Sequence, residues 1–164
     1  MSEFTGGVIL AQIRKLDTVV GDIRGNARNV YEGIRDLPGL RLRASHDPAG
    51  ELGTGVYLDF KNKETRDRFL AAMKAENVPA GPPGGSVLLP TQPHIEAKRT
   101  LHPKWPSFTS ERGRAIQYGA ACCPRTIDIL NRFGGVPLDP KFTRRETDDV
   151  VAAIRKVYPA IVKT

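Results

Sequence analysis

Two histidines and one tryptophan within a single long segment have side chains suited to binding a polyhydroxylated ligand: His94, His102 and Trp105. Imidazoles can hydrogen-bond to hydroxyl groups, and an indole ring can stack on an apolar face. The segment around them, residues 81–108, is rich in proline and glycine, and loops of such length usually carry function or pack on a partner. These three residues form the best polar–aromatic cluster of the chain, and packing of the loop onto its own domain is the alternative to a binding role.

Covalent catalysis by lysine is not predicted. A lysine that forms a Schiff base needs a pKa lowered by burial or by nearby positive charge. None of the lysines lies in an apolar run that would bury it: Lys15, Lys61, Lys63, Lys74, Lys98, Lys104, Lys141, Lys156 and Lys163. We therefore assign no catalytic and no cofactor-binding residue within this chain.

The two cysteines are adjacent, Cys122 and Cys123, and with three scattered histidines they give no metal-ligand spacing. We predict them as buried apolar side chains rather than as a nucleophile or a disulfide. Such cysteine usage is typical of the reducing cytoplasm. The glycines at 81–85 lack the Lys-Ser/Thr ending of a phosphate-binding loop, so we interpret that stretch as a turn.

Charge and hydropathy argue against two classes of partner, with nucleic-acid binding through the positive charge kept as a weaker alternative. The net charge is +7, but the basic residues are dispersed, which is typical of solvated faces rather than of a nucleic-acid surface. The apolar runs are much shorter than the roughly 20 residues of a membrane span, and the first residues resemble no targeting signal. We therefore expect neither a nucleic-acid nor a membrane partner.

An amphipathic helix is predicted over residues 1–37, ending where Pro38 and Gly39 follow. Its apolar or small residues recur at steps of three and four: Ile9, Ile13, Leu16, Val20, Ile23, Ala27, Val30 and Ile34. Gly21 and Gly25 are the expected sites of a kink. We interpret this segment as a connecting or interface helix whose apolar seam, Ile9–Ile34, packs against a partner.

Residues 38–164 are predicted to form a small α/β (α+β) domain with a short, mostly antiparallel sheet and packing helices. The expected elements are strands at 40–44 and 55–60, a helix from Asn62 to about Lys74, an edge strand at 78–80, helices at 110–120 and 124–133, an extended segment at 134–138, and a helix from Thr143 to about Tyr158. Asn77 is placed to end the first of these helices, and Thr143 with Glu146 forms a capping-box pattern at the last.

Several stretches of the chain resemble the DegT/DnrJ/StrS aminotransferases, which are pyridoxal-phosphate enzymes of fold type I. Residues 1–17, with Met-Ser-Glu followed by Leu-Ala-Gln-Ile, are similar to a stretch from the middle of that family. Residues 37–40, 56–60, 68–70 and 75–79 and the helix that begins at Thr143 are similar to parts of its small C-terminal domain. The resemblance implies an aminotransferase of amino-sugar biosynthesis, acting on keto-sugars (which include nucleotide-sugars) or cyclitols. It also implies that His94, His102 and Trp105 help to hold the sugar substrate in the intact enzyme.

The resemblance also implies what lies outside this chain. In the family, the Schiff-base lysine and the groups that hold the cofactor's ring precede the Met-Ser-Glu stretch. We therefore expect a truncated chain that lacks the large cofactor-binding domain. Alone, such a chain would bind no pyridoxal phosphate and would be inactive. Whether the chain is itself an enzyme stays open. It would form a homodimer or dock onto a large aminotransferase domain through Ile9–Ile34. The alternative is a stand-alone binding or scaffold module that uses the same helix.

Overall fold

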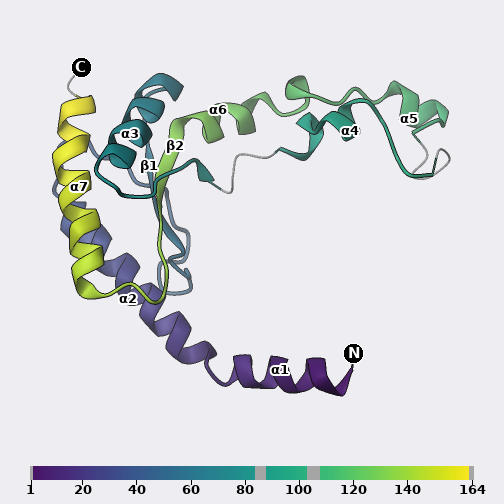
Figure 1. The fold of residues 1–164 in the computed structure, drawn as a ribbon. Helices are drawn as coiled ribbons and strands as arrows, with labels where there is room; N and C mark the ends of the chain where they lie inside the picture. Colours follow the sequence, from purple (N-terminus) through teal and green to yellow (C-terminus); the bar gives the residue numbers. More distant parts are fainter. Residues whose placement is uncertain (1, 84–87, 103–107, 163–164) are drawn as a thin grey trace.

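The computed structural model describes residues 2–83, 88–102 and 108–162. Its elements are α1 (Glu3–Ile13), α2 (Leu16–Ile34), β1 (Gly55–Asp59), α3 (Lys63–Ala75), η2 (Leu89–Thr91), α4 (Pro93–Glu96), α5 (Glu111–Ala115), η3 (Ala120–Cys122), α6 (Pro124–Arg132), β2 (Phe133–Pro137) and α7 (Arg144–Val162). Helices α2, α3 and α7 pack around the strands, whereas α1 and the segment that carries α4 and α5 project from this body toward the same side (Figure 1).

The sheet is short and antiparallel. β1 pairs with β2 in a register that places Val56 opposite Val136 and Leu58 opposite Gly134. Two single bridges extend it, Leu42 to Leu58 on one side and Gly81 to Gly135 on the other. A short, mostly antiparallel sheet with packing helices confirms the predicted fold class. The strands expected at 40–44 and 78–80 are not formed as strands, and only the single bridges at Leu42 and Gly81 lie in or next to those stretches.

The domain has one hydrophobic core, formed by residues of this chain. Side chains with no exposed surface come from the sheet, α2, α3 and α7: Val56, Leu58, Val136, Val30, Ile34, Phe69, Met73 and Ile154. The rings of Phe60 and Phe69 lie 4.9 Å apart between centroids. Each large apolar side chain buried in this way contributes about 1.5–3 kcal/mol to folding.

Helices α2 and α7 are joined closely along their length. A Cβ on Gly33 would lie 2.7 Å from the side chain of Val151, so the absence of a side chain at Gly33 permits this approach. Arg155 donates from Nη1 to the Gly33 carbonyl at 2.8 Å and to Asp36 at 2.5 Å. Asn29 donates to the buried Thr147 hydroxyl at 2.6 Å. These contacts link residues more than a hundred positions apart and fix α2 against the end of the chain.

The apolar seam predicted for the N-terminal helix divides into two halves. Its second half, from Ile23 to Ile34, is buried within this chain against the domain's own core, so the expectation of a free seam over Ile9–Ile34 is wrong there. Its first half is exposed: the exposed fraction is 42% for Ile9, 59% for Ile13 and 54% for Leu16. Periodicity identified the apolar face but not the element that covers it.

The helix also breaks at a different place from the one predicted. It ends at Ile13 and begins again at Leu16, and the Lys15 amide donates to the Gln12 carbonyl at 3.0 Å, three residues back, which tightens the turn. α2 runs unbroken through Gly21 and Gly25. Four residues of α2 are buried, Ile23, Ala27, Val30 and Ile34, whereas α1 has no buried residue.

Local helix-end signals were predicted correctly. The Asn62 side chain accepts the Thr65 amide at 2.9 Å and begins α3, and Asn77 has a φ of 60° just beyond the end of α3. Thr143 and Glu146 form the expected capping box. The helix predicted at 110–120 is shorter, because α5 ends at Ala115. The last helix is longer than predicted and continues through Pro159 to Val162.

We expect the capping box to give a pH-dependent contribution to stability. Hydrogen bonds from the Thr143 amide (2.6 Å) and hydroxyl (2.8 Å) lower the pKa of Glu146 below its usual value of 4.5. A carboxylate whose pKa is lowered on folding stabilises the folded state above its unfolded pKa, and that contribution is lost as the pH falls through the folded pKa. Glu146→Ala should therefore lower Tm at neutral pH, with the difference shrinking as the pH falls below the usual pKa of 4.5 and through the lowered pKa of the folded state.

Thermal unfolding followed by circular dichroism at several pH values measures this effect. Glu32→Ala is the matched control, because Glu32 is also an exposed helical glutamate but lies in the last turn of α2. A Tm difference for Glu146→Ala that stays constant into acid would contradict the expected linkage.

Candidate functional site

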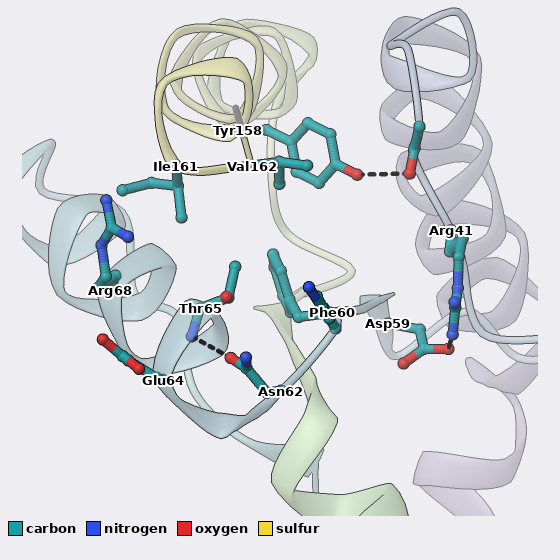
Figure 2. A pocket seen from close by; sticks show the side chains of 12 residues that line it. Arg41, Asp59, Phe60, Asn62, Glu64, Thr65, Arg68, Tyr158, Ile161 and Val162 are labelled. Carbon is teal, nitrogen blue, oxygen red and sulfur yellow. Dashed lines mark hydrogen bonds and ion pairs between the residues drawn. The ribbon is translucent and has the colours of Figure 1, made fainter. Parts of the chain in front are cut away.

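A cavity of about 610 Å³ opens between the start of α3, the end of α7 and the chain around Gly39 (Figure 2). Its lining is predominantly polar and includes three cationic and two anionic side chains: Arg41, Lys61, Arg68, Asp59 and Glu64. The remaining lining residues are Gly39, Phe60, Asn62, Thr65, Tyr158, Ile161 and Val162. This is a volume in the range of small-molecule sites.

The ion pairs around Asp59 form one wall of this cavity. The bridge between Leu42 and Leu58 brings the preceding Arg41 beside the following Asp59, and Arg41 donates to Asp59 Oδ2. Arg132 from α6 donates to Asp59 Oδ1 at 2.7 Å. The hydrogen bond to Asp59 raises the pKa of Arg41. Because both carboxylate oxygens accept from guanidinium groups, Asp59 positions its neighbours and is poorly placed to act as a general base.

An aromatic pair lies beneath the polar rim. The Tyr158 hydroxyl donates to the Gly39 carbonyl at 2.8 Å, and burial raises the pKa of Tyr158, so the phenol stays protonated at neutral pH. Its ring centroid lies 6.2 Å from that of Phe60. The hydrogen bond from Tyr158 to Gly39 links the end of α7 to the turn that follows α2, as seen in Figure 2.

The first turns of α3 form the opposite wall. Figure 2 shows Glu64, Thr65 and Arg68 on α3 across the cavity from Ile161 and Val162 at the end of α7. The twelve lining residues include no histidine, cysteine or serine. The charged and hydroxyl-bearing side chains that are present can hydrogen-bond a polar ligand.

The residues predicted to contact substrate lie elsewhere. His94 is exposed on α4, and His102 is exposed with its carbonyl accepting the Thr100 hydroxyl at 2.7 Å. Trp105 lies outside the described residues. Neither histidine lines the cavity of Figure 2; both belong to the segment that projects from the domain in Figure 1. Their role in substrate binding stays a prediction.

Polar contacts give the projecting segment its own structure. Lys98, which has a φ of 53°, donates from Nζ to the carbonyls of Gly113 (3.1 Å) and Arg114 (2.8 Å) and so joins the end of α4 to α5. The rings of Phe108 and Tyr118 meet edge to face at 5.8 Å. His94 and His102 are therefore carried by a locally folded segment.

The cysteine prediction was wrong for Cys122. Its side chain is exposed and its Sγ donates to the Gln117 carbonyl at 2.7 Å, whereas Cys123 is half-buried. A short 3₁₀ turn (η3) at this point directs Cys122 outward, a feature that the apolar character of cysteine does not reveal. Among the described residues, no cluster of three or more His, Cys, Asp or Glu side chains is placed to hold a metal ion.

The Arg41–Asp59–Arg132 wall was missed by the sequence reasoning. One signal was available in the two neighbouring predicted strands: Arg41 precedes Leu42, and Asp59 follows Leu58. An antiparallel register that pairs the two leucines therefore also pairs the two charges. Arg132 gives no such signal, because its approach depends on the position of α6.

No family model and no curated protein matches this sequence. Solved structures do match the fold. A sugar aminotransferase from Streptococcus pneumoniae in its apo form matches 94% of this chain with a TM-score of 0.65 at 9% identity. A DegT DnrJ EryC1 StrS aminotransferase from Brucella abortus matches 90% with a TM-score of 0.56 at 17% identity. The sugar aminotransferase CalS13 from Micromonospora echinospora matches 90% with a TM-score of 0.59 at 14% identity.

The chain has the fold of part of a sugar aminotransferase. It spans about a third of those chains, 33% to 34% of their length. The resemblance indicated by the sequence motifs is thereby confirmed at the level of the fold. No helix within the described residues combines the length and the hydropathy needed to cross a membrane.

The lysines that the structure describes do not fit the covalent attachment of pyridoxal phosphate. The Streptococcus pneumoniae enzyme was also solved in a PMP form, and DesV from S. venezuelae in complex with a ketimine intermediate. Here Lys98 is half-buried, but its Nζ is engaged by two carbonyls. The other lysines within the described residues are exposed: Lys15, Lys61, Lys63, Lys74, Lys141 and Lys156. None has the buried surroundings that lower the pKa of a Schiff-base lysine.

Proposed function

We propose that this chain is the C-terminal segment of a cytoplasmic, pyridoxal-phosphate-dependent aminotransferase that acts on keto-sugars or cyclitols in amino-sugar biosynthesis. The observation that carries the proposal is the match of at least 90% of the chain to one third of several sugar aminotransferases. The sequence motifs at residues 1–17 and 56–60 support it independently. In the whole enzyme the cofactor would supply the electron sink for amino transfer.

The projecting segment would provide contacts to the sugar. The imidazoles of His94 and His102 are exposed, which suits hydrogen bonding to hydroxyl groups of a free or nucleotide-linked sugar. We propose the same role for Trp105 from its residue type. Figure 1 places this segment and α1 on the same side of the domain, where a larger cofactor-binding domain would meet both.

Helix α1 would be the main contact with that larger domain. It carries apolar side chains around its whole circumference, and none is buried within this chain. Phe4 is 82% exposed, Leu10 50% and Ile13 59%. Helices that are apolar on all sides are normally buried in the core of a larger protein. We therefore expect α1 to be buried against a surface outside this chain. A homodimer of the whole enzyme would place a second copy nearby.

The 164 residues alone should not carry out transamination. Incubation of the purified chain with pyridoxal phosphate is expected to give no absorbance band of a lysine-bound cofactor, and borohydride should fix no cofactor to the protein, because no described lysine is buried. Intact-mass spectrometry after borohydride treatment measures the outcome. A modified lysine recovered in stoichiometric yield would refute the proposed inactivity of this chain.

The proposed relation to a longer protein has its own test. Peptide mapping of the protein from its source should find peptides that continue upstream of Met1, and that longer protein should transfer an amino group from glutamate or glutamine to a keto-sugar. An 18.0 kDa mature protein would favour the alternative function, a stand-alone binding or scaffold module.

One observation favours that alternative: the domain has a closed core of its own, as expected of an independent module. As such a module it would dimerise or dock through α1. Sedimentation over a range of concentrations tests this, because exposed apolar side chains on α1 should drive association. A monomer at all concentrations would rule out a docking role of α1 between copies.

A further inference from the structure

A second cavity, of about 440 Å³, lies between α2 and the loop of residues 43–53. Its lining residues are Arg24, Ala27, Arg28, Tyr31, Leu42, Arg43, Ser45, Pro48, Ala49, Glu51 and Gly53. The aminotransferase proposal makes no use of it. Its walls, charges and apolar surface together indicate what it binds.

The cavity is held open by contacts within the chain. Arg24 donates from Nε to the Glu51 carbonyl at 3.0 Å and from Nη2 to the Gly50 carbonyl at 3.1 Å, which fastens the loop to α2. Gly53 has a φ of 76°, and a Cβ there would lie 2.7 Å from the side chain of Ala27. The loop and the helix therefore meet at both contacts, which fix the walls of the cavity.

Positive charge dominates the lining. Three guanidinium groups face one carboxylate, and Arg43 forms an ion pair with that carboxylate, Glu51. Arg24 meets only neutral carbonyl oxygens. Arg28, one turn further along α2, makes no ion pair or hydrogen bond with any residue that the structure describes. Two of the three guanidinium charges thus lack a counter-charge, which makes the cavity attractive to anions.

Tyr31 adds a neutral donor to the same face of α2. It lies three residues after Arg28, so the two side chains are neighbours on the helix surface. Burial raises the pKa of Tyr31, and its hydroxyl therefore stays protonated at neutral pH. The rest of the lining includes the apolar side chains of Leu42, Pro48 and Ala49. A ligand matched to this lining combines an anionic group with an apolar body.

We propose that this cavity binds an organic phosphate monoester, with the phosphate between Arg24 and Arg28 and the organic part against Leu42 and Pro48. A phosphate monoester carries a charge of about −1.5 to −2 at neutral pH, which matches two uncompensated guanidinium groups better than a single carboxylate does. Guanidinium groups also pair with phosphate oxygens through two parallel hydrogen bonds. Tyr31 is placed to donate a further one. This site is independent of the aminotransferase proposal.

Phenyl phosphate is the probe for this site. Isothermal titration should detect its binding to the full chain, and amide shifts in a ¹H–¹⁵N spectrum should map to α2 and to residues 43–53. Arg28→Ala is expected to weaken binding about tenfold or more, as loss of a charge-assisted pair does. Arg125→Ala is the matched control, because Arg125 is an exposed helical arginine on α6 outside the cavity, and it should leave the affinity unchanged.

Two further ligands separate the contributions of charge and apolar surface. Inorganic phosphate lacks the apolar body and benzoate lacks the second charge, so both should bind more weakly than phenyl phosphate. Equal affinity of the wild-type chain and Arg28→Ala, with the variant's Tm unchanged, would overturn the proposal. If benzoate binds more tightly than phenyl phosphate, the proposed phosphate monoester is wrong and the site prefers a carboxylate. If inorganic phosphate binds as tightly as phenyl phosphate, the proposed contact of the organic part with Leu42 and Pro48 is wrong.

Discussion

Ile34→Asp is expected to unfold the domain, whereas Ile13→Asp, the same change in the same predicted seam, should leave its stability almost untouched. Ile34 has no exposed surface and lies in the core with Val30, whereas Ile13 is 59% exposed on α1. A buried, unpaired carboxylate costs about 4 kcal/mol or more, out of a total stability of about 5–15 kcal/mol for a typical domain. An exposed substitution changes stability by about 0.5 kcal/mol or less.

Urea unfolding followed by far-ultraviolet circular dichroism distinguishes the two variants. Ile13→Asp should unfold at the wild-type midpoint and, if α1 drives association, should sediment as a smaller species. Comparable destabilisation by both substitutions would show that α1 belongs to the domain's own core, contrary to the exposure of the seam before Ile23.

Gly135→Ala should disrupt the sheet. A Cβ at Gly135 would lie 2.0 Å from the Val56 carbonyl oxygen and 2.8 Å from Tyr57 Cα, both of which are backbone atoms of the paired strand. Because backbone cannot rotate away as a side chain can, β1 and β2 must separate, and the paired Gly81 bridge must shift with them. We expect a loss of about 3 kcal/mol or more.

Gly25→Ala is the matched control for that substitution. Nothing lies within 4 Å of a Cβ at Gly25, and alanine in a helix interior is favoured over glycine by about 1 kcal/mol. Thermal or urea unfolding should therefore show opposite signs for the same chemical change at the two glycines. A neutral result for Gly135→Ala would mean that the strands are not paired in the described register.

Signals within a few residues of each other were enough to predict several elements. Asn62, Asn77 and the Thr143–Glu146 pair act through hydrogen bonds or φ angles that span one helical turn, so their roles follow from local chemistry. The strand at Gly55–Asp59 was predicted near its observed bounds for the same reason, since its apolar residues and the flanking polar ones are consecutive.

Contacts between distant parts of the chain were beyond prediction from one sequence. The partner of Val30 and Ile34 includes α7, which lies more than a hundred residues later, and a periodic pattern says nothing about which element covers it. The same holds for both cavities, because they form where α2, α3, α7 and two loops meet. Residue type alone led to His94 and His102, and the structure places both in a segment away from the cavity of Figure 2.

The break between α1 and α2 has a consequence for how such a domain can be inherited. No residue of α1 is buried, and the first core residue of α2 is Ile23, so the exposed apolar residues of the N-terminal side all precede the core. Substitutions in α1 are therefore free to follow changes in whatever surface covers it, without a cost to the core. We expect the core to keep its structure when α1 is exchanged for another sequence, because no residue of α1 belongs to it.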